Sequence, residues 1–380
     1  MNKIYLDHAA TSPVHPIVIE KMVQSMNLIY GNPSSIHSIG RDARKELDHS
    51  REILAKSIGA KEQEIILTAG GTEADNLAIF GTAYARKNEG NHIITSQIEH
   101  HAVLHACHKL EKDGFEVTYL PVNEQGIISI DDVKSALRDD TILVTLIFGN
   151  NEVGTLQPIK EIGEFLKDHL ASFHTDAVQA YGLVPLSVEG LHVDLLSVSS
   201  HKINGPKGIG FLFQKKGTKL SPQLFGGQQE KKRRAGTENV PATIAFAEAV
   251  KISEQTLVEK VETFNLFKET MVEILENERI QFKLNGHEKY ALPHILNISF
   301  PHTDVESLLV NLDMEGLAVS SGSACTAGSI DPSHVLVAMY GEKAEELRNS
   351  IRFSFGYGLT MQDIEEAAKK TAKVVKRLVK

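Results

Sequence analysis

Residues 64–87 read EIILTAGGTEADNLAIFGTAYARK, and this stretch sets the architecture of the 380-residue chain. A short β-rich run ends at two glycines, and a segment with helical spacing follows them. Similar units recur through residue 199, and this alternation predicts a mostly parallel sheet covered by helices. The later runs are HIITSQ, HAVLHACHKLEKDG, EVTYLPV, SIDDVKSALR, TILVTLIFG, IKEIGEFLKDHL, SFHTDA and LLSVSS, with a further strand at GIGFLF.

The pattern changes after Pro241, where a long helical stretch runs to about Glu278. A strand at HILNISF, a helix at DVESLLVNLDMEG, a strand at SIRFSF and a last helix from Thr360 follow it. A chain of this length exceeds the usual limit of a single core, so a second, smaller α+β domain is expected. We expect residues 1–15 to accompany the small domain, residues 16–255 to form the large domain, and residues 256–380 to form the small one.

The composition is that of a soluble globular enzyme, with 42% hydrophobic and 23% charged residues. A formal net charge of −9 argues against a protein built to bind a nucleic acid backbone. The N-terminus lacks the apolar core of a signal peptide, and the apolar run from Thr141 is too short to span a membrane. The two cysteines, Cys107 and Cys325, are then expected to stay as thiols in the cytoplasm.

Polar residues follow three of the predicted strands, at the edge of an open α/β sheet where ligands gather. Each group also has a simpler explanation, because strand-to-helix turns need glycine and a lysine after a strand is usually solvated. Together, however, they supply the lysine, the carboxylate and the phosphate donors that a pyridoxal phosphate site requires. These residues are Lys202, Asp176, and Thr72 with Ser199 and His201, next to the glycine turn at Gly70 and Gly71.

Several longer segments then resemble one family along nearly the whole chain, the bacterial cysteine desulfurases of the NifS/IscS type in the class V aminotransferase superfamily. The resemblance implies a pyridoxal phosphate enzyme of fold type I, with a seven-stranded sheet, that acts as a homodimer. It also implies conversion of L-cysteine to L-alanine, with the sulfur left as a persulfide on a cysteine. The segments are YLDHAAT, TAGGTEADNLAI, GNNEVGT, HTDAVQA, SVSSHKINGPKG, RRAGTEN and SSGSACTAG.

The resemblance assigns a role to each cofactor residue. Lys202 would hold the cofactor and move the proton at the substrate Cα, and Asp176 would pair with the pyridine nitrogen. Gln179 would bond the phenolic oxygen, while His100 would stack on the ring and exchange a proton with the substrate thiol. The phosphate would be held by the side chains of Thr72, Ser199 and His201, by the amides of Gly71 and Thr72, and by Thr237 of the neighbouring subunit.

Two further residues would serve the substrate. Asn151 would lie near cofactor and substrate, and Arg352 would bind the substrate carboxylate. An isolated arginine on a strand is otherwise more often a rim charge. The chain departs from the family at Asn204 and at residues 356–358, which touch none of these groups.

Cys325 is the expected nucleophile, in the stretch VSSGSACTAGSIDPSHV of residues 319–335. A structural thiol would have apolar neighbours, whereas this one has small and polar ones. Small neighbours would also let the segment carry the thiol from a pocket to the surface. These neighbours are Gly322, Ser323, Ala324, Thr326, Ala327 and Gly328.

Other interpretations remain open at this point. An aminotransferase or a selenocysteine lyase would keep the fold and cofactor, although an aminotransferase needs no thiol; a non-catalytic sulfur carrier would not need Lys202. His101, His105 and His108 share a helical face beside Cys107, but their spacing matches neither H-E-x-x-H nor C-x-x-C, so no metal is expected. The sulfur acceptors would be proteins, a tRNA-thiolating enzyme or an iron–sulfur scaffold, with no direct nucleic acid and no membrane partner.

Overall fold

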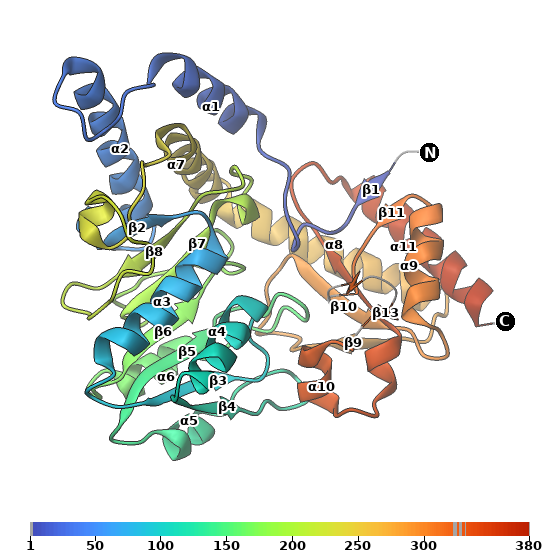
Figure 1. Ribbon diagram of the computed structural model, residues 1–380. Helices are drawn as coiled ribbons and strands as arrows, with labels where there is room; N and C mark the ends of the chain where they lie inside the picture. The colour runs from blue at the N-terminus through green and yellow to red at the C-terminus, as the bar shows by residue number, and fades with distance from the viewer. Residues whose placement is uncertain (1–2, 322–324, 327–328, 331, 380) are drawn as a thin grey trace.

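The computed structural model describes residues 3–321, 325–326, 329–330 and 332–379. A seven-stranded sheet forms its centre, in the order β2-β8-β7-β6-β5-β3-β4. Only β8 runs antiparallel to its neighbours, so the predicted mostly parallel α/β fold is confirmed (Figure 1). The strands are β2 (Ile65–Thr68), β3 (His92–Ser96), β4 (Glu116–Leu120), β5 (Thr141–Ile147), β6 (Ser172–Asp176), β7 (Leu195–Ser199) and β8 (Gly210–Gln214).

The inner strands are buried along their whole length, because helices cover both faces of the sheet. β5 therefore reads TILVTLI, a continuous apolar run with two threonines rather than an alternating one. The first-half helices are α1 (Pro16–Leu28), α2 (Ser38–Lys56), α3 (Gly71–Arg86), α4 (His101–Lys112), α5 (Ile130–Ala136), α6 (Ile159–Leu166) and α7 (Val240–Gln255).

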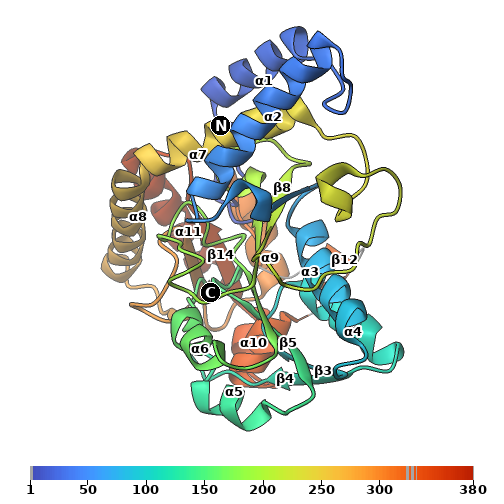
Figure 2. The ribbon, with the colours of Figure 1, turned by 90° about the vertical axis from the view of Figure 1, so that its left-hand side faces the viewer.

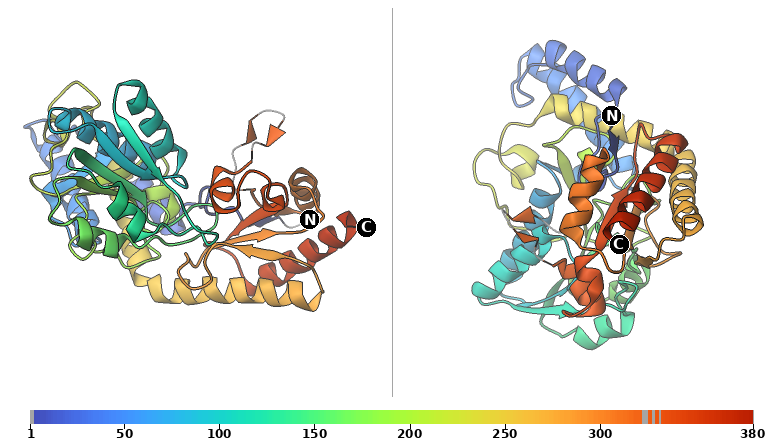
Figure 3. Two further views of the ribbon diagram at one scale, coloured as in Figure 1. Left: turned by 90° about the horizontal axis from the view of Figure 1, so that it is seen from below. Right: turned by 90° about the vertical axis from the view of Figure 1, so that its right-hand side faces the viewer.

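A second apolar core surrounds an antiparallel sheet of order β14-β10-β9. Ile4 and Leu6 belong to this core, and β1 (Ile4–Tyr5) pairs with β11 (Leu317–Ala318). Figure 3 shows these elements standing apart from the large sheet. The remaining elements are α8 (Leu257–Asn277), β9 (Lys283–Asn285), β10 (Ile295–Ser299), α9 (Val305–Met314), β12 (Cys325–Thr326), β13 (Ser329–Ile330), α10 (His334–Tyr340), β14 (Ser350–Ser354) and α11 (Met361–Leu378).

The long helical stretch expected after Pro241 is two helices, because Thr256 leaves the helical conformation between α7 and α8. Its amide still bonds the Ile252 carbonyl, so the chain changes direction without losing that hydrogen bond. None of the described helices is long and apolar enough to cross a membrane. The domain boundaries given above stay a prediction.

Candidate active site

Lys202 lies in a short 3₁₀ turn, Ser200–Lys202, directly after β7. Its ammonium donates to the carbonyl oxygens of Ala9 at 2.5 Å and Ala10 at 2.9 Å, in the N-terminal segment. Burial lowers the pKa of Lys202 to about 8, and the nearby charge of Arg352 adds to this effect. Lys202 therefore loses its proton more easily than an ordinary lysine, as an amine that attacks an aldehyde must.

Asp176 ends β6, one strand away from Lys202, and is buried. Its Oδ1 accepts a hydrogen bond from the Val178 amide at 2.9 Å, but burial still raises its pKa to about 6. One polar side-chain atom each of Asp75, His100 and Asp176 lie within 4.8 Å of one another. The expected ring-nitrogen partner and the expected stacking residue thus lie together.

His100 caps α4, where its Nδ1 accepts from the Ala102 amide at 3.1 Å. It keeps an exposed face, yet the surrounding protein lowers its pKa to about 4, and the charge of Lys202 contributes. The ring is therefore neutral near pH 7 and available to a ligand.

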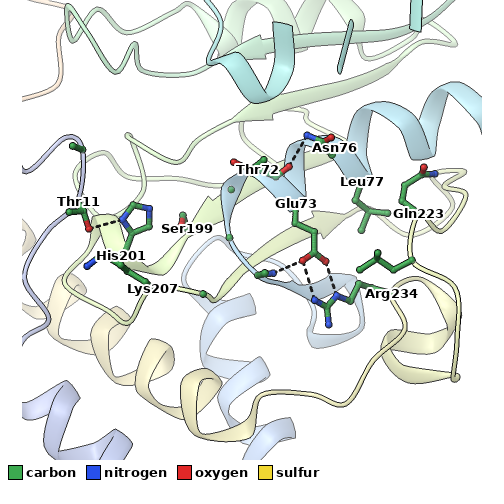
Figure 4. Close-up of a pocket in the computed structure, with 16 residues that line it drawn as sticks. Thr11, Thr72, Glu73, Asn76, Leu77, Ser199, His201, Lys207, Gln223 and Arg234 are labelled. Carbon is green, nitrogen blue, oxygen red and sulfur yellow. Dashed lines mark hydrogen bonds and ion pairs between the residues drawn. The ribbon is translucent and has the colours of Figure 1, made fainter. Parts of the chain in front are cut away.

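The glycine turn opens a cavity of about 720 Å³ at the start of α3 (Figure 4). Gly71, Thr72, Ser199 and His201 all line it, as the sequence predicts for one ligand group. The His201 ring bonds Thr11 Oγ1 at 3.1 Å. Amides at a helix start and these side chains suit an anion.

Arg352 lies on β14 and is buried. It donates to the Asn151 carbonyl at 2.8 Å and to Asp7 Oδ1 at 2.8 Å, while its Nε has no partner among the described residues. Asn151 and Arg352 are thus adjacent. Nε and the second hydrogens of Nη1 and Nη2 are the donors that these two bonds leave for a substrate carboxylate.

Two predicted residues lie elsewhere. Thr237 is exposed and lies outside the lining of the α3 cavity, although Arg234 near it forms an ion pair with Glu73 at 2.7 Å. Cys325 pairs with Ile330 through the backbone of β12 and β13. The position of its thiol, and residues 322–324 and 327–328 around it, fall outside what the structure describes.

Sequence reasoning missed Asp7 and Asp75 as parts of this site. Both lie inside quoted motifs, YLDHAAT and TAGGTEADNLAI, so a signal was present. Asp75 is buried, and burial, with Asp176 nearby, raises its pKa well above the ordinary value.

The histidine row on α4 forms no compact ligand set. The rings of His101 and His105 are 5.1 Å apart and those of His105 and His108 are 6.4 Å apart, and all three residues are exposed. Cys107 points into the core, where burial raises its thiol pKa. In the described part of the chain, only Asp75, His100 and Asp176 bring three such ligand atoms within 4.8 Å.

The residues present fit pyridoxal phosphate. A Cβ on Gly71 would lie 2.7 Å from Val178 Cγ2, so glycine keeps the anion end of the site open. Lys202, just after β7, supplies the amine, and Asp176, at the end of the neighbouring strand β6, supplies a buried carboxyl group. The fold and these residues are typical of an α/β enzyme that uses pyridoxal phosphate.

Comparison with known proteins specifies the family. Residues 4–366 match the model of the class-V aminotransferases. The chain is 61% identical to "Putative cysteine desulfurase IscS 1" of Bacillus subtilis (strain 168), and the match covers 100% of both chains. Among solved structures, it is similar to a NifS-like protein, with a TM-score of 0.92, 32% identity and coverage of 99% and 100% of the two chains. Another, "SspA in complex with cysteine", has a TM-score of 0.82, 37% identity and coverage of 93% and 99%.

The chain belongs to the class-V aminotransferase family, and within it to the cysteine desulfurases of the NifS/IscS type. It is a pyridoxal phosphate-dependent enzyme, as the residues at the strand ends predict.

Proposed function

We propose that this protein converts L-cysteine to L-alanine and passes the sulfur through Cys325 to protein acceptors. The observation that carries the proposal is the amine of Lys202, whose pKa burial lowers to about 8 and which lies close enough to Asp176, His100 and Arg352 for their charges to act on one another. The names of the relatives, and the similarity to SspA, whose structure is of a complex with cysteine, support the substrate.

Lys202 holds the cofactor in this proposal and moves the proton at the substrate Cα. The cofactor supplies an electron sink, and Asp176 keeps the pyridine nitrogen protonated so that the sink is strong. Gln179 bonds its phenolic oxygen. The phosphate is held by Gly71, Thr72, Ser199 and His201, with Thr237 coming from the neighbouring subunit.

Substrate binding falls to Arg352, whose guanidinium takes the carboxylate, with Asn151 beside it. His100 exchanges a proton with the substrate thiol in this proposal, and to accept one its Nδ1 gives up the hydrogen bond from the Ala102 amide. The Cys325 thiolate then attacks the substrate sulfur. The new S–S bond forms as the C–S bond breaks, and the electron pair left on carbon takes a proton to give alanine.

The acceptors we propose are a tRNA-thiolating enzyme, an iron–sulfur scaffold or both. The compartment we propose is the cytoplasm, where a reactive thiol stays reduced. A homodimer is supported by exposed apolar side chains. Ile36, between α1 and α2, is 91% exposed, and Phe225, in the loop between β8 and α7, is 87% exposed. The helices α1 and α2 project beyond the sheet (Figure 2).

Replacement of Cys325 by serine tests the function. We expect Cys325→Ser to keep its cofactor but to lose alanine production from L-cysteine, because a hydroxyl cannot accept sulfur as a persulfide. Mass spectrometry of the wild type should find one extra sulfur on the peptide with Cys325, removable by a thiol. Cys107→Ser, a change in the core, is the matched control and should remain active.

Wild-type alanine production by Cys325→Ser would refute the role of this thiol. Transamination of L-cysteine that does not depend on Cys325 would instead favour an aminotransferase. Turnover of selenocysteine but not of cysteine would favour a lyase.

A further inference from the structure

The side-chain amide of Gln179 is engaged at both ends. Its Nε2 donates to the Ala9 carbonyl at 2.8 Å, and its Oε1 lies 3.2 Å from the Nε2 of His294. Gln179 and His294 are both buried. His294 comes from the small-domain side, directly before β10, and its carbonyl accepts from the Phe355 amide at 2.8 Å.

These contacts determine which atoms carry hydrogen. The Ala9 carbonyl can only accept, so the group facing it must be the NH₂ of Gln179. The amide oxygen therefore faces His294 and can only accept, which requires a hydrogen on His294 Nε2. A neutral imidazole then has a bare Nδ1, and this atom has no hydrogen-bond partner among the described residues.

The neutral form also agrees with the surroundings of His294. Burial moves its pKa well below the ordinary value, and the charges of Lys268, Lys202, His8 and Lys260 act in the same direction. An imidazolium here would add a positive charge close to the three lysines Lys268, Lys202 and Lys260. His294 is thus a fixed donor rather than a titrating one.

The orientation matters because Gln179 and Lys202 share one acceptor. Both donate to the Ala9 carbonyl, so the NH₂ group of Gln179 lies on the side where Lys202 holds the cofactor. Ala9 is the only acceptor of this NH₂ within the described part of the chain, which leaves its second hydrogen for a ligand. If the amide turned over, its oxygen would meet the phenolic oxygen of the cofactor and repel it.

We propose that His294 is a positioning residue, which locks the amide of Gln179 so that it always presents a donor to the cofactor. The inference rests on the cofactor role proposed for Gln179. It assigns to the small domain an indirect contribution to the cofactor environment, which His294 makes through its hydrogen bond to Gln179.

Two substitutions of His294 test whether the hydrogen-bond donor must lie at the position of Nε2 or whether any donor at residue 294 is sufficient. In His294→Gln the new amide nitrogen can occupy the place of Nε2, whereas in His294→Asn it falls near the place of Nδ1, out of reach of Gln179. We expect His294→Asn to release pyridoxal phosphate about five- to tenfold faster, the loss of roughly one hydrogen bond. The pH dependence of its visible absorption should shift in the same direction as in Gln179→Ala. His294→Gln should restore both properties.

Two readouts are used, both without turnover. One is the rate at which the released cofactor is trapped by a reagent that reacts with aldehydes, and the other is the visible spectrum at each pH. His92→Gln, at a buried histidine that bonds Thr141 and Thr118, controls for lost stability and should change Tm only. Wild-type spectra and release in His294→Asn, while Gln179→Ala changes, would overturn the inference. An unchanged Gln179→Ala would overturn the inference and the role of Gln179 together, but would leave alanine production by the wild type as separate support for the desulfurase.

Discussion

Burial acts in opposite directions on the two central ionisable groups of the site. It lowers the pKa of Lys202 to about 8 and raises that of Asp176 to about 6, so each is closer to neutral than in water. The Lys202 ammonium therefore loses its proton more easily than an ordinary lysine. One backbone amide, that of Val178, bonds Oδ1 of Asp176, and the nearby charge of Lys202 also favours the ionised carboxylate, but burial outweighs both effects.

Asp176→Asn should change how the stability of the cofactor-free protein depends on pH. A raised pKa means that the folded state binds the proton more tightly than the unfolded state, so this group costs stability as pH rises from about 4 through 6. Relative to the wild type, the variant should gain on the order of 2 kcal/mol between pH 4 and 7. Urea unfolding at each pH measures it, with the exposed Asp139→Asn as control. A constant difference across this range would contradict the prediction.

Gly71→Ala should weaken cofactor binding. The added methyl would lie 2.7 Å from Val178 Cγ2, and the resulting shift at the start of α3 would disturb the amides that we propose hold the phosphate. We expect the Kd for pyridoxal phosphate to rise roughly tenfold, about the effect of one strained contact. Gly190→Ala, where the nearest atom is 3.4 Å away, should bind normally in equilibrium dialysis. Equal affinities in the two variants would exclude this explanation.

At the scale of elements, the start of α10 is tied to the large domain. Ser333 caps this helix by accepting from the Leu336 amide at 3.2 Å, and its hydroxyl donates to the buried Glu152 at 2.5 Å. His334 adds a contact of 2.8 Å to the Glu99 carbonyl. The chain that follows the Cys325 stretch is thereby attached beside the GNNEVG motif.

Ser333→Ala should destabilise the protein by about 1–3 kcal/mol, since it removes a helix cap and leaves Glu152 without that donor. Ser129→Ala removes the cap of α5 at an exposed position and should cost less, about 1 kcal/mol or below. Denaturant unfolding measures both. Hydrogen exchange should also become faster in α10 for Ser333→Ala, and an α10 as protected as in the wild type would argue against this attachment.

At the scale of the whole molecule, a single chain leaves its proposed site incomplete. Thr237 is exposed, and apolar side chains near α1 and in the 225 loop have no cover. A second copy would cover these side chains and could bring its own Thr237 to the phosphate end of the site.

Mixed dimers test this arrangement. We expect Lys202→Ala and Thr237→Ala to be impaired as homodimers, but co-refolded mixtures should recover activity. The mixed dimer has one site with an intact Lys202 and, from the other subunit, an intact Thr237. Mixing should recover about a quarter of wild-type alanine production, since half of the dimers are mixed and each has one good site. No recovery, or full activity of a demonstrated monomer, would show that Thr237 does not act across subunits.

The sequence by itself determined the sheet and the strand-end placement of the cofactor residues. Alternation of strand and helix patterns requires parallel strands whose carboxyl ends share one edge, so Asp176 and Ser199 had to lie at the same edge of the sheet. The glycine turn before α3 could be assigned to this edge from the sequence for the same reason, because it directly follows a strand. Motif resemblance added His100, Asn151, Arg352 and Thr237, which no local pattern marks. Their roles, like that of Cys325, stay predictions.

Only the tertiary structure decided which distant residues meet this edge. Ala9 and Asp7 arrive from the N-terminus, and His294 and Arg352 from the small domain, over sequence separations that no periodicity encodes. The pKa shifts of Lys202 and Asp176 could also be derived only from the fold. Desolvation depends on what surrounds a group in space and not on its neighbours in the chain. The tautomer of His294 is of this kind: it follows from two hydrogen bonds of Gln179, and these exist only once the two domains are packed together.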